Sequence, residues 1–231
     1  MILYLAAGKS YPGFISYYRR ELQKGGSRDL FRGELLLMSA AEIEVTKKRT
    51  GAGRITACAL FVALIAVGAF LKIDIPLPLY TMHFTLQWFF VLMAGLLLGK
   101  KDGALSVFAY ICVGLAGFPV FAAGGGPAYV LRPGFGFLLG FIPAAFLLGF
   151  LTEKKKSGYL WKLFAATLAM VVYYSVGAVY FYLIKNLYVG EQVSFGVVVV
   201  SYCLITVVPD FILCCLAVTL SSRIKPLVRK I

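Results

Sequence analysis

The chain has 231 residues, of which 61% are hydrophobic and 14% charged, and its mean hydropathy is +0.87. A soluble domain has about a quarter charged residues, so this composition excludes an ordinary soluble protein and indicates a helical membrane protein. The formal net charge of +13 fits Lys and Arg in cytoplasmic loops better than a nucleic-acid partner.

Residues 1–50 differ from the rest of the chain, because they mix charges with glycine and contain no apolar run long enough to span a bilayer. They also lack the charged, apolar and cleavage-site order of a signal peptide. We interpret them as an amino-terminal extension that is either cytosolic and poorly ordered or not native, with Met38 as an alternative start. Residues 51–231 then form the membrane domain.

Apolar runs in this domain predict an all-α integral membrane protein, a bundle of six transmembrane helices. The second and third runs are short for a bilayer, which requires about 20 residues. The six predicted spans are 55–73, 84–98, 104–118, 135–151, 160–184 and about 197–220.

The distribution of Lys and Arg predicts the orientation. If the amino end lies inside, the inner segments hold most of these cations, whereas the outer segments hold only Lys72, Arg132 and Lys185. By the positive-inside rule both termini lie in the cytoplasm of a multi-pass protein of the cell membrane. The segments expected to face outward are 74–83, 119–134 and 185–196.

The segment 118–141 is the most unusual part of the membrane domain. Three consecutive glycines at 124–126 and two prolines after them prevent a continuous helix from crossing it. Irregular backbone at a membrane face must line a cavity or be covered by protein, because lipid cannot satisfy its polar groups. We interpret the segment as a wall or lid over a ligand pocket; a plain helix connector is the alternative.

Three polar residues are candidates for ligand binding. Asp210 is the acidic residue inside a predicted span, where a carboxylate costs at least a few kcal/mol unless a ligand, a proton or a basic residue compensates for it. Arg132 can bind a carboxylate bidentately, or it can reach to lipid headgroups. Gln87 offers two donors and an acceptor, although helix packing is the commoner role of such a residue.

Aromatic residues gather in the outer half of the predicted bundle. Tyr129 and Tyr180 are the better pocket candidates because they neighbour small residues, and Phe121 is a third candidate. The sole histidine, His83, is expected at the surface and does not make a metal site alone. The chain has no Walker A, GxSxG or HExxH motif, so we expect neither an enzyme nor a metal site.

Four stretches in this order resemble the biotin-specific substrate-binding (S) component of energy-coupling-factor (ECF) transporters, the BioY family. They are GRITACALFVALIAVGAFLKIDIPLP, FTLQWFFVLMAGLLLG, GLAGFPVFAAGGGPAYVLRPGFGFLLGF and VVPD. The resemblance implies a six-helix membrane protein that captures biotin from the outer face and catalyses no reaction. It further implies a transmembrane T component and two ABC-type ATPase subunits as partners, and no cofactor, biotin being the transported substrate.

The resemblance also implies roles for single residues. The family's Gly-rich loop corresponds to the triplet that includes Gly125 and Gly126, and its late acidic position to Asp210. Two departures stand out, because Gly134 takes the place of the usual threonine and Leu213 that of a lysine found in many members. Arg132 would suit the biotin carboxylate, and Asp210 with Gln87 the ureido group, while aromatic residues would cover the ring.

The first predicted helix carries a pair of small residues, Ala59 and Ala63, four positions apart. This pair resembles the motif by which S components dock on the T component, since small residues allow close approach of two helix backbones. Two alternatives to biotin uptake remain at this point. One is an S component for a different vitamin, and the other is a membrane-embedded enzyme that uses Asp210 as an acid or base.

Overall fold

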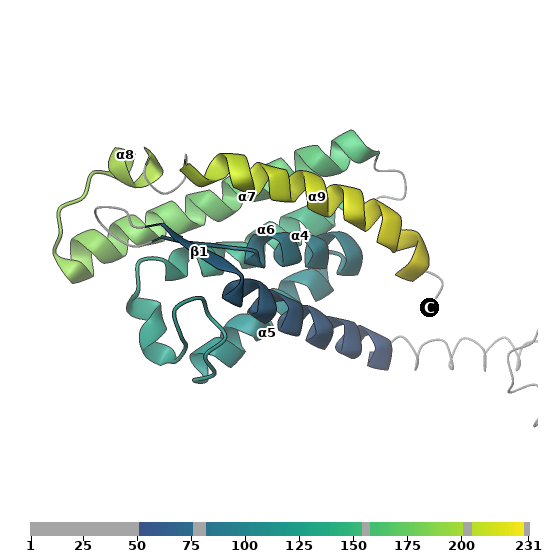
Figure 1. Ribbon diagram of the computed structural model, residues 1–231, viewed down its shortest axis with the longest axis horizontal. Coiled ribbons are helices and arrows are strands. Elements are labelled where there is room, and N and C mark those ends of the chain that lie inside the picture. Colours follow the sequence, from purple (N-terminus) through teal and green to yellow (C-terminus); the bar gives the residue numbers. More distant parts are fainter. Residues whose placement is uncertain (1–50, 76–81, 154–157, 201–204, 229–231) are drawn as a thin grey trace, which may run out of the picture. The chain divides into compact units, whose positions relative to one another are not determined.

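The computed structural model describes residues 51–75, 82–153, 158–200 and 205–228, and most of these belong to helices (Figure 1). The predicted extension 1–50 lies outside the described residues. From Arg54 onward the chain forms one compact unit. Its helices are Gly51–Phe70, α4 (Gln87–Leu98), α5 (Lys100–Leu115), α6 (Phe135–Thr152), α7 (Tyr159–Leu183), α8 (Phe195–Val198) and α9 (Ile205–Val228), with a 3-10 turn η1 (Pro127–Leu131) and a π-helical turn η2 (Ile184–Val189).

The expectation of a helical membrane protein is confirmed. Within the described ranges, four helices are long and apolar enough to cross a bilayer, namely Gly51–Phe70, Phe135–Thr152, Tyr159–Val189 and Thr206–Ile224. α4 and α5 are shorter, as the sequence predicts for the second and third spans. The predicted sixth span, 197–220, corresponds to α8 and α9, with residues 201–204 between them outside the described residues.

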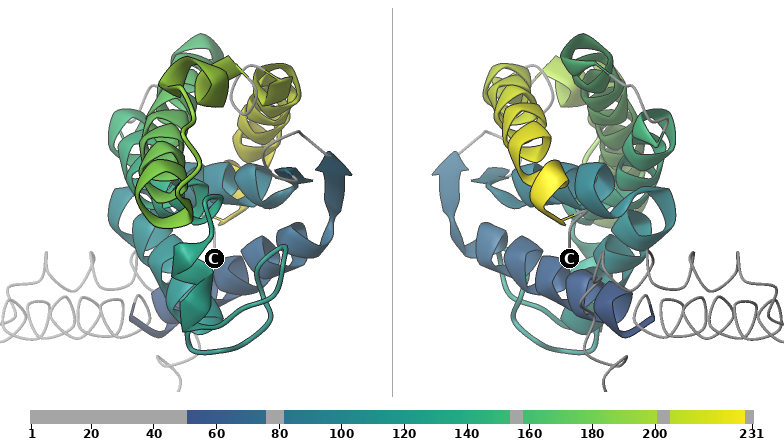
Figure 2. Two further views of the ribbon diagram at one scale, coloured as in Figure 1. Left: turned by 90° about the vertical axis from the view of Figure 1, so that its left-hand side faces the viewer. Right: turned by 90° about the vertical axis from the view of Figure 1, so that its right-hand side faces the viewer.

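Helix packing centres on α4, which contacts α5, α6 and α9, and on the long contact between α6 and α7. Figure 2 views α7 and α9 nearly end on. Gly140 permits the close approach of α6 to α7, because a Cβ atom there would lie 2.7 Å from the Tyr173 carbonyl oxygen. The core is apolar and rich in aromatic rings, and Trp88 on α4 stacks on Tyr173 at 4.7 Å between ring centroids.

A short antiparallel hairpin follows the first helix, which the sequence does not predict. Strand β1 (Lys72–Ile75) pairs with β2 (Met82–Thr85), with Asp74 opposite His83. The first predicted span therefore extends too far, since its helix ends at Phe70, and the second begins too early, since α4 starts at Gln87. Strands of four residues are too short to produce a clear period-2 pattern beside long apolar helices.

The Gly-rich segment, residues 116–134 between α5 and α6, interrupts the helices, as predicted. α5 ends at Leu115 and α6 begins at Phe135, and η1 is the helical turn between them. At the other end of the helices, ion pairs join elements distant in sequence. Arg54 binds Asp102 at 2.6 Å, and Lys100 binds Glu153 at 2.8 Å. The irregular segment and these ion pairs thus mark the two ends of the bundle.

Candidate functional site

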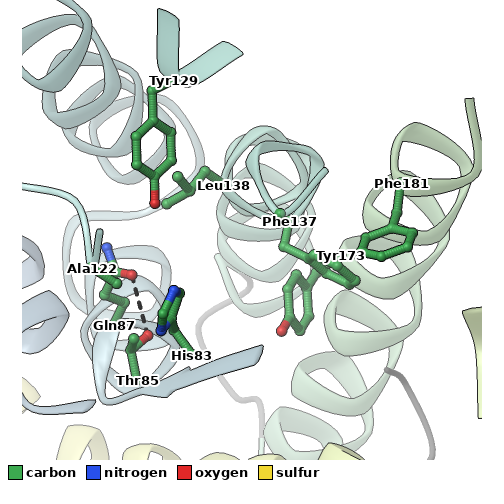
Figure 3. A pocket seen from close by; sticks show the side chains of 10 residues that line it. His83, Thr85, Gln87, Ala122, Tyr129, Phe137, Leu138, Tyr173 and Phe181 are labelled. Atoms are coloured by element: carbon green, nitrogen blue, oxygen red, sulfur yellow. Dashed lines mark hydrogen bonds between the residues drawn. The ribbon is translucent and has the colours of Figure 1, made fainter. Parts of the chain in front are cut away.

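A pocket lies between the hairpin, the start of α4, the Gly-rich segment, and helices α6 and α7 (Figure 3). Its cavity volume is about 80 Å³, which is enough for several water molecules. One side carries the polar side chains of His83, Thr85 and Gln87. The rest of the wall is mainly aromatic and apolar, and consists of Ala122, Tyr129, Gly134, Phe137, Leu138, Tyr173 and Phe181.

Gln87 connects three elements at the polar side of this pocket. It is only 3% exposed, and its Nε2 donates to the Tyr110 hydroxyl on α5 at 2.5 Å, while its Oε1 accepts from Thr85 at 3.1 Å. The Tyr110 hydroxyl in turn donates to the carbonyl of Val120 at 2.9 Å. This chain of hydrogen bonds joins the start of α4 to the Gly-rich segment, so Gln87 both lines the pocket and positions its wall.

Phe121 lies behind the pocket rather than in its lining. It is 1% exposed, and its ring packs on Tyr129 at 4.6 Å and on Tyr110 at 5.5 Å between centroids. Tyr129 itself lines the pocket. The role that these contacts give Phe121 is to support the Tyr129 ring.

Gly125 and Gly126 shape the segment that carries Ala122 and Tyr129. A Cβ atom on Gly125 would lie 2.1 Å from the carbonyl oxygen of Phe118, so a larger residue cannot occupy this turn. The Gly126 N–H donates to the Gly114 carbonyl at the end of α5, at 2.7 Å. Among the described residues that line the pocket, neither glycine appears, so the structure gives them a role in the loop backbone.

Arg132 and Tyr180 hold η1 from its two sides. The Arg132 side chain is exposed, and its guanidinium carbon lies 5.0 Å from the centroid of the Tyr129 ring, a cation–π contact. The Tyr180 hydroxyl on α7 donates to the Val130 carbonyl. Arg132 therefore contacts the pocket-lining Tyr129, and Tyr180 attaches η1 to α7, but neither is among the described residues that line the pocket.

Asp210 is buried between α7 and α9, with 2% of its surface exposed. The Tyr174 hydroxyl lies 2.5 Å from its carboxylate and 2.9 Å from the hydroxyl of Thr206. The ring of Tyr173, the neighbour of Tyr174 on α7, packs on the Tyr174 ring at 4.5 Å between centroids. Because the Tyr173 ring lines the pocket, the two tyrosines connect Asp210 to the pocket wall.

Ala59 and Ala63 lie on the exposed side of the first helix. Ile55 and Val67 continue the same stripe at intervals of four residues and are 72% and 53% exposed. The opposite side of this helix is buried, as Ile65 illustrates with 0% exposure. The two alanines are thus accessible to lipid or to another helix.

Several residues of the pocket were not predicted from the sequence. His83 was expected at the surface but lines the pocket, and Thr85, Tyr173 and Phe181 were not candidates. A signal for His83 and Thr85 exists in retrospect, because polar residues alternate in Lys72-Ile-Asp74 and in His83-Phe-Thr85. Alternation of this kind is typical of a strand with one polar face.

Comparison with known proteins identifies the family. The profile described as "BioY family" matches residues 39–230. The chain belongs to the BioY family. It is 38% identical over 172 residues to the "Probable biotin transporter BioY" of Lysinibacillus sphaericus, which covers 74% of this chain and 86% of that protein. It is 42% identical over 133 residues to the "Biotin transporter BioY" of Thermotoga maritima, covering 57% of this chain and 73% of that protein.

A solved structure agrees with this assignment. The crystal structure of the S-component for biotin from an ECF-type ABC transporter superposes with a TM-score of 0.69 and 27% sequence identity, covering 77% of this chain and 93% of that chain. The resemblance to the BioY family that the sequence predicts is therefore confirmed, and with it the S-component fold.

The two departures from the BioY pattern lie at informative places. Gly134, where the resemblance leads to the expectation of a threonine, lines the pocket directly before α6, so this position contributes no hydroxyl to the wall. Leu213 is 8% exposed and packs in the apolar core, one turn of α9 beyond Asp210. In this BioY protein the Asp210 carboxylate accepts a hydrogen bond from the hydroxyl of Tyr174, a neutral side chain.

Proposed function

We propose that this chain is the biotin-binding S component of an ECF-type ABC transporter and captures biotin from the outer face of the cell membrane. The observation that carries the proposal is the pocket itself. It lies beneath the Gly-rich segment, in a BioY-family chain whose relatives are named biotin transporters. Its aromatic wall and polar side match a ligand that has an apolar thioether ring, a ureido group and an acidic tail.

The ring of biotin would lie against the aromatic and apolar wall, where Tyr129, Phe137 and Tyr173 present their side chains (Figure 3). Apolar contact of this kind is worth about 25 cal/mol for each Å² removed from water. Each aromatic ring thus adds to the affinity without selecting the ligand. Selection must come from the polar groups at the two ends of biotin.

The ureido group would be bound by Asp210 and Gln87. Asp210 supplies acceptor oxygens, and it lies behind Tyr174, whose ring packs on the pocket-lining Tyr173. Gln87 already forms hydrogen bonds through both ends of its amide, so it contributes a fixed polar surface. The carboxylate of biotin would face the Gly-rich segment, where Arg132 lies beside Tyr129.

The orientation is part of the proposal. Both termini would lie in the cytoplasm of a six-span protein, with the hairpin and the Gly-rich segment at the outer face. The Arg54–Asp102 and Lys100–Glu153 pairs support this orientation, because they lie in segments rich in Lys and Arg at the end expected inside.

Transport would require partners. We propose that the exposed stripe containing Ala59 and Ala63 docks on a transmembrane T component, since small residues let helix backbones approach closely. Two ABC-type ATPase subunits would supply the energy, and this chain would catalyse no reaction. Residues 1–50 are proposed to lie outside the functional domain; the family match begins at residue 39 and leaves residues 1–38 uncovered.

Uptake of labelled biotin tests this function. The chain is expressed in bacteria that lack their own biotin transporter, with and without the T component and ATPases of its source. Accumulation that requires the chain, and that excess unlabelled biotin abolishes, is expected. If cells without the chain accumulate as much labelled biotin as cells that express it, the proposal is contradicted.

A further inference from the structure

The hairpin before α4 has one polar face, and this face forms a wall of the pocket. In its register Lys72 pairs with Thr85, Ile73 with Phe84, and Asp74 with His83. Residues directly opposite each other and residues two apart on one strand share a face. His83 and Thr85 line the pocket, so Lys72 and Asp74 belong to the same side of the hairpin. Ile73, on the other side, is 66% exposed.

The polar face carries charges in close contact. His83 Nδ1 lies 2.5 Å from one carboxylate oxygen of Asp74, and Lys72 Nζ lies 3.4 Å from the other. The hydrogen bond to His83, together with the one to Lys72, holds the pKa of Asp74 below its ordinary value. Asp74 is therefore ionised at neutral pH, and Lys72 balances its charge.

This balance makes the charge of the wall depend on His83. When the imidazole is neutral, Lys72 and Asp74 cancel and the face has no net charge. When the imidazole is protonated, the face has a net charge of about +1, because Asp74 can offset only one of the two cations. Histidine is the side-chain type that changes its charge between pH 5 and 8. The other ionisable side chains among the described lining residues are the phenols of Tyr129 on η1 and Tyr173 on α7.

We infer that the polar face of the hairpin belongs to the ligand site and that protonated His83 binds the carboxylate of the transported acid. The inference rests on the proposed function, because it assumes that the pocket takes biotin. It adds a residue to the site and a preference for the acid over uncharged analogues.

The two ends of the pocket differ in hydrogen-bonding chemistry in a way that supports this inference. Asp210, behind the stacked Tyr173 and Tyr174 rings, offers acceptor oxygens, which suit the N–H groups of a ureido ring. The hairpin offers the imidazole of His83 beside the ammonium of Lys72, and these groups suit a carboxylate.

The pH dependence of binding has a definite sign. An aliphatic carboxylic acid such as biotin is ionised throughout pH 6 to 8, since such groups have pKa values of about 4 to 5. A carboxylate binds a cationic imidazole more tightly than a neutral one, so we expect biotin to bind more tightly at pH 6 than at pH 8. His83 is 19% exposed, so solvent screens the charge partly, and we expect about a fivefold loss of affinity for biotin between pH 6 and 8.

The test is equilibrium binding of biotin and of uncharged biotinamide to the purified full chain at pH 6 and pH 8. Wild type should show the fivefold loss for biotin and less than a twofold change for the amide. His83→Gln should bind biotin equally at both pH values, near the wild-type affinity at pH 8. His83→Lys should also remove the pH dependence but keep the tighter affinity, because its charge is permanent over this range. Ile73→Thr, on the other face of the hairpin, should behave like wild type.

The outcomes separate the two levels of the proposal. If wild type binds biotin equally at both pH values, or if both His83 variants keep the pH dependence of wild type, the role of His83 is overturned and the proposed function is not. A wild-type chain that binds no biotin at either pH would overturn the proposed function and this inference together.

Discussion

Asp210→Asn is the substitution that best distinguishes a ligand-binding role of the buried carboxylate from a structural one. The substitution keeps the size of the side chain and one acceptor oxygen, so the Tyr174 hydroxyl, now 2.5 Å from the carboxylate, still has an acceptor. A ureido N–H of biotin would lose a charged acceptor and could face an amide N–H instead. The variant should therefore stay folded but bind biotin more weakly.

The magnitude follows from the strength of the bonds involved. A hydrogen bond to a charged group is worth about 1.5–3 kcal/mol and a neutral one about 0.5–1.5 kcal/mol, so each ureido N–H bound by Asp210 should lose about 1–1.5 kcal/mol. This corresponds to a roughly 5- to 13-fold weaker affinity for each such bond. Biotin and biotinamide should be affected alike, because the change lies at the ureido end.

Arg132→Ala provides the contrasting case. Arg132 is exposed and lies beside the pocket-lining Tyr129, so its proposed pair with a carboxylate is partly screened and worth about 1 kcal/mol. The affinity for biotin should fall about fivefold, and the affinity for biotinamide should change much less. Lys101→Ala, which removes an exposed cation from the start of α5, is the matched control and should leave both affinities unchanged.

Isothermal titration calorimetry of the purified variants, combined with thermal unfolding in the absence of ligand, measures these effects. If Asp210→Asn lowers the unfolding temperature but binds biotin as tightly as wild type, Asp210 is structural. If Arg132→Ala weakens the acid and the amide equally, Arg132 does not contact the carboxylate. Either result would refute the reasoning for the residue concerned.

Three further predictions concern topology, docking and the amino-terminal segment. A cysteine introduced at Gln192 should react with an impermeant thiol reagent in intact cells and one at Lys155 should not; the reverse pattern would invalidate the orientation. Ala59→Trp should leave biotin binding nearly intact but reduce transport with the partner subunits. The control Leu216→Trp, at a 54% exposed position on α9, should change neither binding nor transport. Loss of binding in Ala59→Trp would show that this alanine is needed for the pocket. Deletion of residues 1–40 should leave membrane insertion and binding unchanged, and loss of binding would disprove their interpretation as an extension.

The helical part of the fold could be predicted because its signals are long. Each membrane helix carries an apolar run of many residues, and glycine and proline mark the interruption before α6 clearly. The hairpin was missed because β1 and β2 have four residues each and lie directly beside apolar helices. As a consequence His83 was interpreted as a surface residue, although its strand turns it toward the pocket.

The candidate site was predictable in its parts but not in its contacts. The cost of a buried carboxylate singles out Asp210 in the sequence, and the structure places it at 2% exposure. Its partner Tyr174 lies 36 residues earlier, on another helix, and nothing in the local sequence distinguishes this tyrosine from Tyr180. Packing between α7 and α9 decides which hydroxyl meets the carboxylate, and a single sequence does not contain that information.

Equilibrium binding of a panel of labelled vitamins to the purified chain tests the central claim most directly. The panel contains biotin, thiamine, riboflavin and pantothenate, each measured in the same detergent or nanodisc preparation. We predict saturable binding of biotin to a single site per chain, which unlabelled biotin displaces and the other vitamins do not. Saturable binding of another vitamin with no binding of biotin would contradict the account and would identify the chain as an S component with a different substrate.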